Sequence, residues 1–365
     1  MTTKQTMTGP VNSHNEWDPL EEVIIGSLDG AMFPAWNVIN EATAPPPDDW
    51  ASIEKKVGGA GVAYPPELVE AARKDLAEFI HILEAEGVIV RRIQPTNHAT
   101  LFGTPTWQVP SGFCSANPRD PFLVIGNDII ETPMADRGRY FEAWAYRELF
   151  KEYFKAGAKW TSAPKPQLLD DLYDWNYTVP KQDDPMRFII TEFEPVFDAA
   201  DFVRCGRDIF GQQSNVTNRL GITWLQRHLG DGYRVHELQS LYAQTIHIDS
   251  TFMPIAPGKV LVNPKFLDVN KLPPILKKWE VLIAPTPVPH RCPLGIVSDW
   301  LNINILMLDE ERIIVEKRQE PTIKALKQWG FKPILCSFEA YYPFMGSFHC
   351  ATLDIRRRGE LKSYF

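Results

Sequence analysis

The sequence predicts an α/β fold in which five similar units close into a ring. A hairpin, a helix and a strand that begins near a glycine recur five times along the 365 residues. Hydrophobic residues make up 44% and charged residues 23%, which is typical of a chain with a sizeable globular core. A last strand expected around 348–355 would return to the first unit and close the ring. A chance run of α/β units in one open sheet would give a similar pattern, and this alternative stays open.

The first unit shows the repeat most clearly. A strand around 23–25 precedes a helix at about 67–86, whose apolar residues follow a 3.6-residue spacing. Pro66 suits the first turn of this helix and Gly87 its C-terminal end. A strand at 88–90 follows.

The other four units repeat this order with shorter connections. We expect their hairpin turns at 126–127, 205–208, 257–258 and 309–312. We expect their helices near 140–155, 216–228, 273–278 and 322–329. Two long connections, 27–64 and 161–188, interrupt the repeat, and we expect them to rim or cover a site because long loops in compact domains are usually functional.

The composition restricts the class of protein. A formal net charge of −8 argues against a general nucleic-acid binder and is compatible with a small cationic substrate. The five widely spaced cysteines fit neither a disulfide framework nor a zinc ribbon, which indicates a reducing, cytoplasmic compartment. No apolar run is long enough to span a membrane, and residues 1–15 lack a signal or transit pattern.

Cys350 lies in a short strand-like stretch fifteen residues before the end of the chain, behind a glycine-containing turn. A lone cysteine in such a strand is often an inert core residue, but a thiolate beside an imidazolium or a cationic substrate is a nucleophile. Because adjacent strand residues face opposite sides, His349 is poorly placed to activate Cys350. His247 is the better candidate base.

His247 and Asp249 are separated by one residue in an apolar context. If this segment is a strand, both side chains point to the same face and toward a common ligand. A buried histidine held by its neighbour would explain the same pattern. Both interpretations stay open at this point.

Further carboxylates stand among apolar residues, where they are costly unless paired. Asp198 lies in Phe-Asp-Ala-Ala-Asp, and Asp120 directly precedes the expected buried strand 122–125. A guanidinium is a planar cation that carboxylates bind through two hydrogen bonds. Solvated turns or an ion pair with Arg119 are the alternatives. Taken together, these groups predict an enzyme that acts on a guanidinium group.

These segments resemble the glycine amidinotransferase family from residue 13 to residue 365. The matching stretches are 15–24, 157–161, 163–166, 192–195, 197–202, 206–210, 247–249, 306–310 and 348–350. The resemblance implies a five-bladed α/β-propeller of pseudo-fivefold ββαβ units, the pentein-like fold. It also implies a single catalytic domain at 13–365 after a flexible N-terminus at 1–12.

The resemblance further implies the chemistry. Cys350, His247 and Asp198 fall on the catalytic positions, and Asp120 and Asp249 on the positions that contact the guanidinium. The family transfers the amidino group of L-arginine to an amine through an amidino-cysteine intermediate, releases ornithine, and needs no metal or organic cofactor. Members often form homodimers.

The chain departs from glycine-using members near the expected carboxylate contact. Their arginine two residues after Asn-Pro is replaced by Phe266, and their Ser-Ser-Lys-Trp reads Val-Ser-Asp-Trp at 297–300. We therefore expect a larger or non-amino-acid amine as acceptor, such as an intermediate of a guanidine-containing natural product. Lys265 or Ser298 is the candidate contact to the donor carboxylate.

Three alternatives to an amidinotransferase stay open on the residues alone. A guanidine hydrolase similar to arginine deiminase would use the same side chains with water in place of the acceptor. A metalloenzyme would use His247, Asp249 and Cys350 as ligands. A catalytically dead binding protein would keep the pocket without the reaction.

Overall fold

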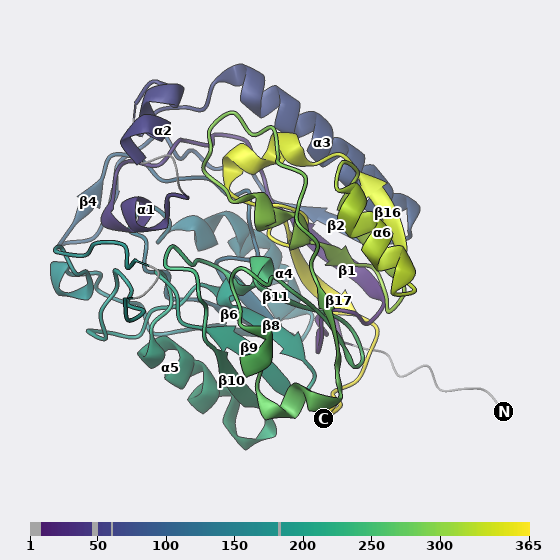
Figure 1. The fold of residues 1–365 in the computed structure, drawn as a ribbon. Helices are drawn as coiled ribbons and strands as arrows, with labels where there is room; N and C mark the ends of the chain where they lie inside the picture. The colour runs from purple at the N-terminus through teal and green to yellow at the C-terminus, as the bar shows by residue number, and fades with distance from the viewer. Residues whose placement is uncertain (1–8, 46–49, 60, 182–183) are drawn as a thin grey trace.

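The computed structural model describes residues 9–45, 50–59, 61–181 and 184–365. Within this part of the chain, five three-stranded sheets and one two-stranded sheet account for the paired strands. The three-stranded sheets surround the centre of the molecule, with helices on the outside (Figure 1). The alternative of one open sheet is therefore wrong.

Each three-stranded sheet is one blade with the same internal pairing. Its middle strand pairs parallel with the strand after the helix and antiparallel with its other neighbour. This antiparallel neighbour precedes the middle strand in four blades and is the C-terminal strand in the first. The blades are β17 (Thr352–Arg357), β1 (Leu20–Ile25) and β2 (Ile89–Arg92); β5 (Phe122–Ile125), β6 (Asp128–Glu131) and β7 (Lys159–Ser162); β8 (Phe202–Cys205), β9 (Asp208–Gln212) and β10 (Arg234–Leu238); β11 (Phe252–Ala256), β12 (Lys259–Val262) and β13 (Glu280–Ile283); and β14 (Leu306–Met307), β15 (Arg312–Glu316) and β16 (Lys332–Cys336). The five expected ββαβ units are confirmed.

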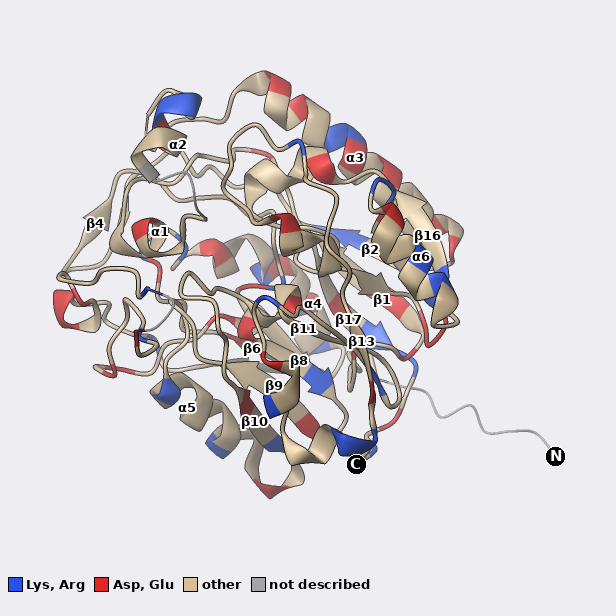
Figure 2. Ribbon diagram, in the orientation of Figure 1, with Lys and Arg blue, Asp and Glu red and all other residues tan. Residues whose placement is uncertain are grey.

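A helical segment joins the middle and last strand of every blade. These segments are α3 (Pro66–Ala85), α4 (Arg147–Lys155), α5 (Arg219–Leu229), the 3-10 helix Pro274–Lys278 and α6 (Glu320–Gln328). Both signs of charge mark the outer helix α3 (Figure 2), whose buried face consists of Ala72, Leu76, Phe79 and Leu83. The helical order expected from the sequence is confirmed, although 3-10 turns occupy 142–146 and 274–278.

The C-terminal strand closes the ring, as the sequence predicts. β17 pairs antiparallel with β1, so the two ends of the chain share one blade. Leu306 and Ile314 of the last blade pack in one cluster with Val23 and Ile25 of the first. The apolar surface between first and last blades is thereby removed from water.

The remaining elements lie in the long connections. Helices α1 (Val38–Thr43) and α2 (Trp50–Val57) lie between β1 and α3, and the pair β3 (Phe102–Gly103) and β4 (Gln108–Val109) precedes β5. Short 3-10 helices occupy 170–172, 199–201, 230–232, 248–250, 269–271, 299–303 and 339–344. None of the helices in the described residues combines the length and apolar character needed to cross a bilayer.

The N-terminus was expected to be flexible over residues 1–12. Residues 1–8 lie outside the described part of the chain. Val11 is buried, and the backbone of Asn12 hydrogen-bonds to both Ile355 and Arg357 next to β17. The packed part of the chain therefore begins before the expected boundary at residue 13.

Two local predictions about strands are wrong, and both concern candidate site residues. His247 has φ of 59° and precedes a 3-10 turn at Ile248–Ser250, so His247 and Asp249 are not on one strand face. The last strand starts at Thr352, which leaves Cys350 in a turn. Local bonds close both turns: the amide of Thr251 donates to Ile248, and that of Thr352 donates to His349.

Candidate active site

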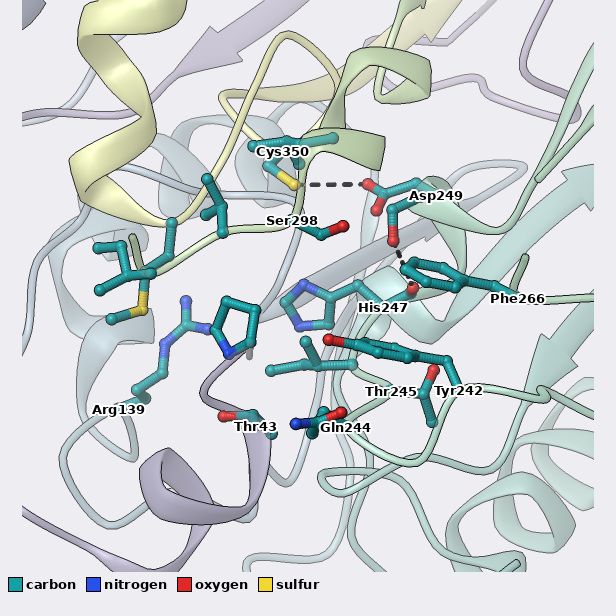
Figure 3. Close-up of a pocket in the computed structure, with 17 residues that line it drawn as sticks. Thr43, Arg139, Tyr242, Gln244, Thr245, His247, Asp249, Phe266, Ser298 and Cys350 are labelled. Carbon is teal, nitrogen blue, oxygen red and sulfur yellow. Dashed lines mark hydrogen bonds between the residues drawn. The ribbon is translucent and has the colours of Figure 1, made fainter. Parts of the chain in front are cut away.

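A cavity of about 110 Å³ lies among the loops at one end of the blades (Figure 3). It collects residues from distant parts of the chain, as a ring of blades allows. His247, Asp249, Ser298 and Cys350 line it, together with Arg139 and an apolar wall. Of the predicted site residues, Asp120 and Asp198 reach the cavity through His247, and Lys265 lies outside it.

Cys350 is held from two sides. Asn304 Nδ2 donates a hydrogen bond to its Sγ at 3.1 Å, and Asn304 Oδ1 accepts from the amides of His349 and Cys350. The thiol itself lies 3.4 Å from Asp249 Oδ2. Burial and the charge of Asp249 raise the pKa of Cys350 to about 12. The free protein therefore holds a thiol at neutral pH, and a cation is needed to favour the thiolate.

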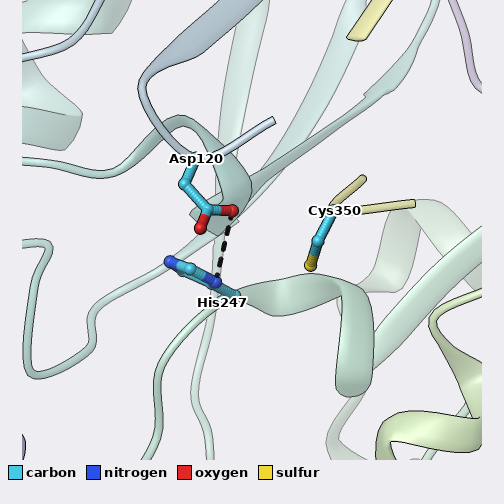
Figure 4. A group of neighbouring side chains, drawn as sticks. All are labelled: Asp120, His247 and Cys350. Atoms are coloured by element: carbon cyan, nitrogen blue, oxygen red, sulfur yellow. Dashed lines mark ion pairs between the residues drawn. The ribbon is translucent and has the colours of Figure 1, made fainter. Parts of the chain in front are cut away.

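His247 lies between two carboxylates beside this thiol; Figure 4 shows it with Asp120 and Cys350. Its Nε2 lies 3.0 Å from Asp198 Oδ2, and its Nδ1 lies 3.6 Å from Asp120 Oδ1. Burial would lower the pKa of His247, but the charge of Asp120 and the bond to Asp198 raise it well above its usual value. The ring is thus an imidazolium at neutral pH and can give a proton to a nearby atom.

Asp249 is kept ionised by its other neighbour. Burial would raise the pKa of its carboxyl, but the hydrogen bond and the charge of His349 lower it. His349 Nδ1 lies 2.8 Å from Asp249 Oδ2, and its Nε2 lies 3.2 Å from Glu16 Oε2. The ring of His349 therefore contacts carboxylates, in agreement with the expectation that it does not activate Cys350.

Two further residues of the site were missed in the sequence. Arg139 places Nη2 at 2.8 Å from Asp120 Oδ2 and pairs with both oxygens of Glu142 at 2.9 Å. Asn304 follows the 3-10 helix Asp299–Ile303 and reaches the sulfur from the last blade. Arg139 belongs to an Arg-Gly-Arg-Tyr stretch and Asn304 to an Asn-Ile-Asn-Ile stretch, and neither pattern marks a site before the ring is closed.

A glycine makes room for the turn that carries Cys350. A Cβ on Gly346 would lie 2.2 Å from Asn117 Oδ1 and 2.9 Å from the Cβ of Cys350. Both distances are too short for ordinary contact. Met345 adopts a left-handed conformation with φ of 59°, which directs the chain into this close approach.

The two candidates for the carboxylate contact differ in how close they come to Cys350, because Ser298 lines both this cavity and a neighbouring one, whereas Lys265 lines only the neighbouring one. The neighbouring cavity has a volume of about 530 Å³, and Lys265 is exposed. Phe266 stands in the wall of the first cavity and stacks on Tyr242, with ring centroids 4.2 Å apart. The position of the missing arginine is therefore an aromatic wall.

The long connections contribute unequally. Thr43 and Pro45, from connection 27–64, line the cavity. Described residues of connection 161–188 do not line it. Leu168, Leu172 and Tyr173 instead belong to the core cluster that includes Ile39 and Ala42 of helix α1. Residues 46–49, 60 and 182–183 of these connections lie outside the described part of the chain.

A possible set of metal ligands is also present. Among the described residues, ligand atoms of Asp120, His247 and Cys350 all lie within 4.8 Å of one another. This set differs from the predicted His247, Asp249 and Cys350, because Asp120 takes the place of Asp249. His247 Nε2 is hydrogen-bonded to Asp198, so only Nδ1, which lies 3.6 Å from Asp120, would be left to bind a metal.

Comparison with known proteins gives strong similarities over nearly the whole chain. The L-arginine:L-lysine amidinotransferase of Pseudomonas savastanoi pv. phaseolicola is 51% identical over 358 residues, which are 98% of this chain and 97% of that protein. The mitochondrial glycine amidinotransferase of Gallus gallus is 44% identical over 98% of this chain and 85% of its own length. No protein-family model matches the chain.

Solved structures agree with the fold. The amidinotransferase SxtG of Microseira wollei, from the saxitoxin biosynthetic pathway, is 66% identical with a TM-score of 0.95 and covers 98% of this chain and all of that one. Dimethylarginine dimethylaminohydrolase of Pseudomonas aeruginosa is only 14% identical with a TM-score of 0.57 over 92% of this chain, and shares the fold alone. The expected pentein fold is confirmed.

Proposed function

The chain belongs to the amidinotransferase family, and we propose that it moves the amidino group of L-arginine to a primary amine through an amidino-cysteine, releasing ornithine. The observation that carries this proposal is the position of the Cys350 thiol between Asp249 and the His247 imidazolium. A carboxylate to hold a guanidinium, a nucleophile for its carbon and an acid for its leaving amine meet in one cavity.

Binding of the donor starts the reaction. We assign Asp249 and Asp120 to the guanidinium, because both are buried carboxylates beside the sulfur and the imidazole. The positive charge of the guanidinium offsets the charge of Asp249, so the thiol proton leaves to solvent and the thiolate forms. Ser298 and Lys265 are the proposed contacts to the remote end of arginine.

Transfer then proceeds in two balanced halves. The thiolate of Cys350 forms a C–S bond to the central guanidinium carbon, and His247 gives its proton to the departing nitrogen as the C–N bond breaks. Asp198, at 3.0 Å from His247 Nε2, orients the ring and stabilises its positive charge. An acceptor amine later gives a proton to His247, bonds to the same carbon and releases the thiolate.

The acceptor is proposed from the relatives and from the aromatic wall of the cavity. Their names include lysine and glycine amidinotransferases and a saxitoxin-pathway enzyme. The aromatic wall at Phe266 favours an acceptor that is larger than glycine, in biosynthesis of a guanidine-containing metabolite. We further propose one catalytic domain over 13–365 and a cytoplasmic location, because all five cysteines are free.

A half-reaction tests the function directly. Purified protein mixed with L-arginine and no acceptor is expected to release one equivalent of ornithine and to carry an amidino group on Cys350, detected by peptide mass spectrometry. Cys350→Ala should abolish both signals. Cys292→Ala is the matched control, because Cys292 is a free thiol away from this cavity.

The alternatives give different products in the same experiment. Citrulline formed without any acceptor-dependent ornithine would contradict transfer and support a guanidine hydrolase. Loss of activity after exhaustive chelation would support the metalloenzyme, and absence of any adduct would support a binding protein. A panel of primary amines then identifies the acceptor, and analytical ultracentrifugation tests the proposed homodimer.

A further inference from the structure

We propose that the cavity next to the reactive one binds the α-amino-acid head of the donor, with Lys265 on its carboxylate and Asp299 on its ammonium. This inference rests on the proposed function and deepens it, since it explains how an amidinotransferase of this sequence would select L-arginine. It assigns Asp299, which had no role in the reaction, as a specificity-determining residue.

The two cavities adjoin each other. The outer cavity, of about 530 Å³, shares Pro45, Tyr242, Val297 and Ser298 with the cavity that contains Cys350. A ligand whose guanidinium lies at Cys350 can therefore pass its aliphatic chain along the Tyr242 wall. The opposite end of that ligand emerges in the outer cavity.

The inner cavity offers no free cation for a carboxylate. Arg139 is the only Lys or Arg among the described residues that line it. Its guanidinium already bonds to both oxygens of Glu142 and to Asp120. The opposite wall is the stacked pair Tyr242 and Phe266. A carboxylate buried here would lack a partner, so the charged head of arginine belongs outside.

The outer cavity is lined by one cationic and one anionic side chain, Lys265 and Asp299, which do not form an ion pair with each other. The ammonium of Lys265 makes no ion pair with any residue in the described parts of the chain, and its backbone amide alone is bonded, to Asn263. Asp299 accepts a hydrogen bond from the amide of His290 at 2.9 Å. Lys265 and Asp299 line the same cavity but do not pair.

The nearest histidine does not neutralise Asp299. The ring of His290 lies 3.7 Å from Asp299 Oδ1, but its Nδ1 accepts from the amide of Cys292 and its Nε2 lies 2.9 Å from the carbonyl of Val297. Both ring nitrogens of His290 are thus engaged by the backbone, and neither makes a hydrogen bond to Asp299. Within the described residues, the carboxylate of Asp299 therefore has no hydrogen bond from a cationic side chain, and 43% of its side chain is exposed.

An unpaired cation and an unpaired anion on one cavity wall are the complement of a zwitterion. A carboxylate would bond to Lys265 and an ammonium to Asp299, and each contact would be a charge-assisted hydrogen bond. Only a donor that carries both groups satisfies both residues. L-arginine has both, agmatine lacks the carboxylate, and 5-guanidinopentanoate lacks the ammonium.

The test compares these three donors in the half-reaction without acceptor. Adduct formation on Cys350 is followed by mass spectrometry at varied donor concentrations, for the natural sequence, Lys265→Met and Asp299→Asn. We expect the natural sequence to favour L-arginine over either analogue by roughly ten- to a hundredfold in apparent KM. Lys265→Met should lose the preference over agmatine only, and Asp299→Asn the preference over 5-guanidinopentanoate only.

Controls separate this inference from the proposed function. Lys271→Met and Asp268→Asn change a charged pair outside both cavities and should keep all preferences. The proposed site for the α-amino-acid head would be overturned if Lys265→Met and Asp299→Asn lost activity equally with all three donors. It would also be overturned if the natural sequence used agmatine as well as arginine. Absence of any adduct with any donor would instead overturn the proposed function.

Discussion

At the scale of single residues, the site shows a nucleophile that is held inactive until its substrate arrives. The buried Cys350 thiol has a pKa raised to about 12 by burial and by Asp249, while His247 carries a proton because of Asp120 and Asp198. A guanidinium placed against Asp249 offsets the charge of this carboxylate and lowers the pKa of the Cys350 thiol, which favours the thiolate. Such an arrangement protects the thiol from adventitious reagents and reserves it for cationic substrates.

The first prediction concerns the reactivity of this thiol. Alkylation of Cys350 by neutral iodoacetamide should be slow at pH 7 and should keep rising beyond pH 9, because the thiolate fraction grows until the pH reaches a pKa of about 12. Chloroacetamidine, which carries an amidinium, should react faster than iodoacetamide at pH 7. Peptide mass spectrometry follows both rates, with glutathione as the reference thiol. A rate with iodoacetamide that levels off below pH 8 would contradict the prediction.

The second prediction concerns Asn304, which positions Cys350. Asn304→Asp keeps an oxygen for the amides of His349 and Cys350, but removes the N–H that donates to sulfur and adds a negative charge. We expect the rate of adduct formation to fall by roughly ten- to a hundredfold, because a charged hydrogen bond of about 1.5–3 kcal/mol is lost. The pH dependence of the rate should also move upward, which a purely structural defect would not produce.

A matched change tests whether the sulfur contact is the cause. Asn302 is also buried, but its Nδ2 bonds to the Thr322 hydroxyl. Asn302→Asp should therefore keep the pH dependence of the natural sequence. An identical shift in both variants would show that the effect comes from the local fold and not from the bond to sulfur.

At the scale of elements, the sequence predicts those segments whose structure depends on their own residues. The helix expected at 67–86 is found at Pro66–Ala85, because its apolar spacing, Pro66 and Gly87 act locally. Gly87 indeed has φ of 83°. The turns at His247 and Cys350 were expected to be strands, because nothing in their own residues indicates the contacts that shape them. Asn304, from another blade, binds the amides of that second turn.

In the candidate site, too, some residues could be predicted from the sequence and others could not. Cys350, His247, Asp198, Asp120 and Asp249 could be named from residue chemistry and from the resemblance, and the structure brings them together. Arg139 and Asn304 could not, because an arginine or an asparagine in an ordinary stretch acquires a partner only when the ring closes. Ser298 lies at the cavity, whereas Lys265 lies in the adjoining one, a distinction that no local pattern contains.

The third prediction concerns the packing of helix α5 against the segment that carries Asp198. A Cβ on Gly221 would lie 2.3 Å from the carbonyl oxygen of Val196 and 3.0 Å from the Cβ of Phe197. Gly221→Ala should force this segment away from the helix, at a cost of roughly 1–3 kcal/mol in unfolding free energy. Because Asp198 follows directly, the rate of adduct formation should fall as well.

The control for this change lies just beyond the other end of the same helix. A Cβ on Gly232 would meet no atom within 4 Å, and the φ of this glycine is not in the left-handed region. Gly232→Ala should leave both urea unfolding and the half-reaction near the values of the natural sequence. Equal behaviour of the two variants would contradict the role of the close contact at Gly221.

At the scale of the whole molecule, buried charges join the blades beneath the site. Arg204 of β8 bonds to Glu16 and to Asp354 of β17, and Arg119 bonds to the same Asp354 at 2.6 Å. Arg357 adds a bond from Nε to Asp354 and another from Nη2 to the carbonyl of Met307 in β14. One network of buried charges thus joins strands of the first, third and last blades. It also includes Arg119, which lies just before β5 of the second blade.

This network also supports the turn that carries Cys350. Arg119 Nε donates to the carbonyl of His349, and Glu16 lies 3.2 Å from the ring of the same histidine. His349 in turn holds Asp249. Removing one member leaves its partners buried without compensation, which usually costs more than the pair itself contributes. The ring and the site therefore depend on the same charges.

The last prediction tests this dependence through Asp354. Burial would raise the pKa of its carboxyl, but the charges of Arg119, Arg357 and Arg204 hold it well below its usual value of 3.8. The carboxylate therefore contributes stability that is complete above about pH 4 and is lost as the pH falls further. Asp354→Asn should lower the free energy of unfolding by roughly 3–5 kcal/mol at pH 7. In urea titrations, the difference from the natural sequence should shrink below pH 4.

Glu311 supplies the comparison for Asp354, because it pairs with Lys332 at the surface with 64% of its side chain exposed. Glu311→Gln should change the unfolding free energy by less than about 1 kcal/mol at every pH. If Asp354→Asn proved equally mild, the buried network would not hold the blades together. If the loss at Asp354 were large but independent of pH between about 2 and 7, a packing defect and not its charge would be responsible. The predicted pH dependence distinguishes the two, because only an ionised carboxylate among three arginines loses its contribution on protonation.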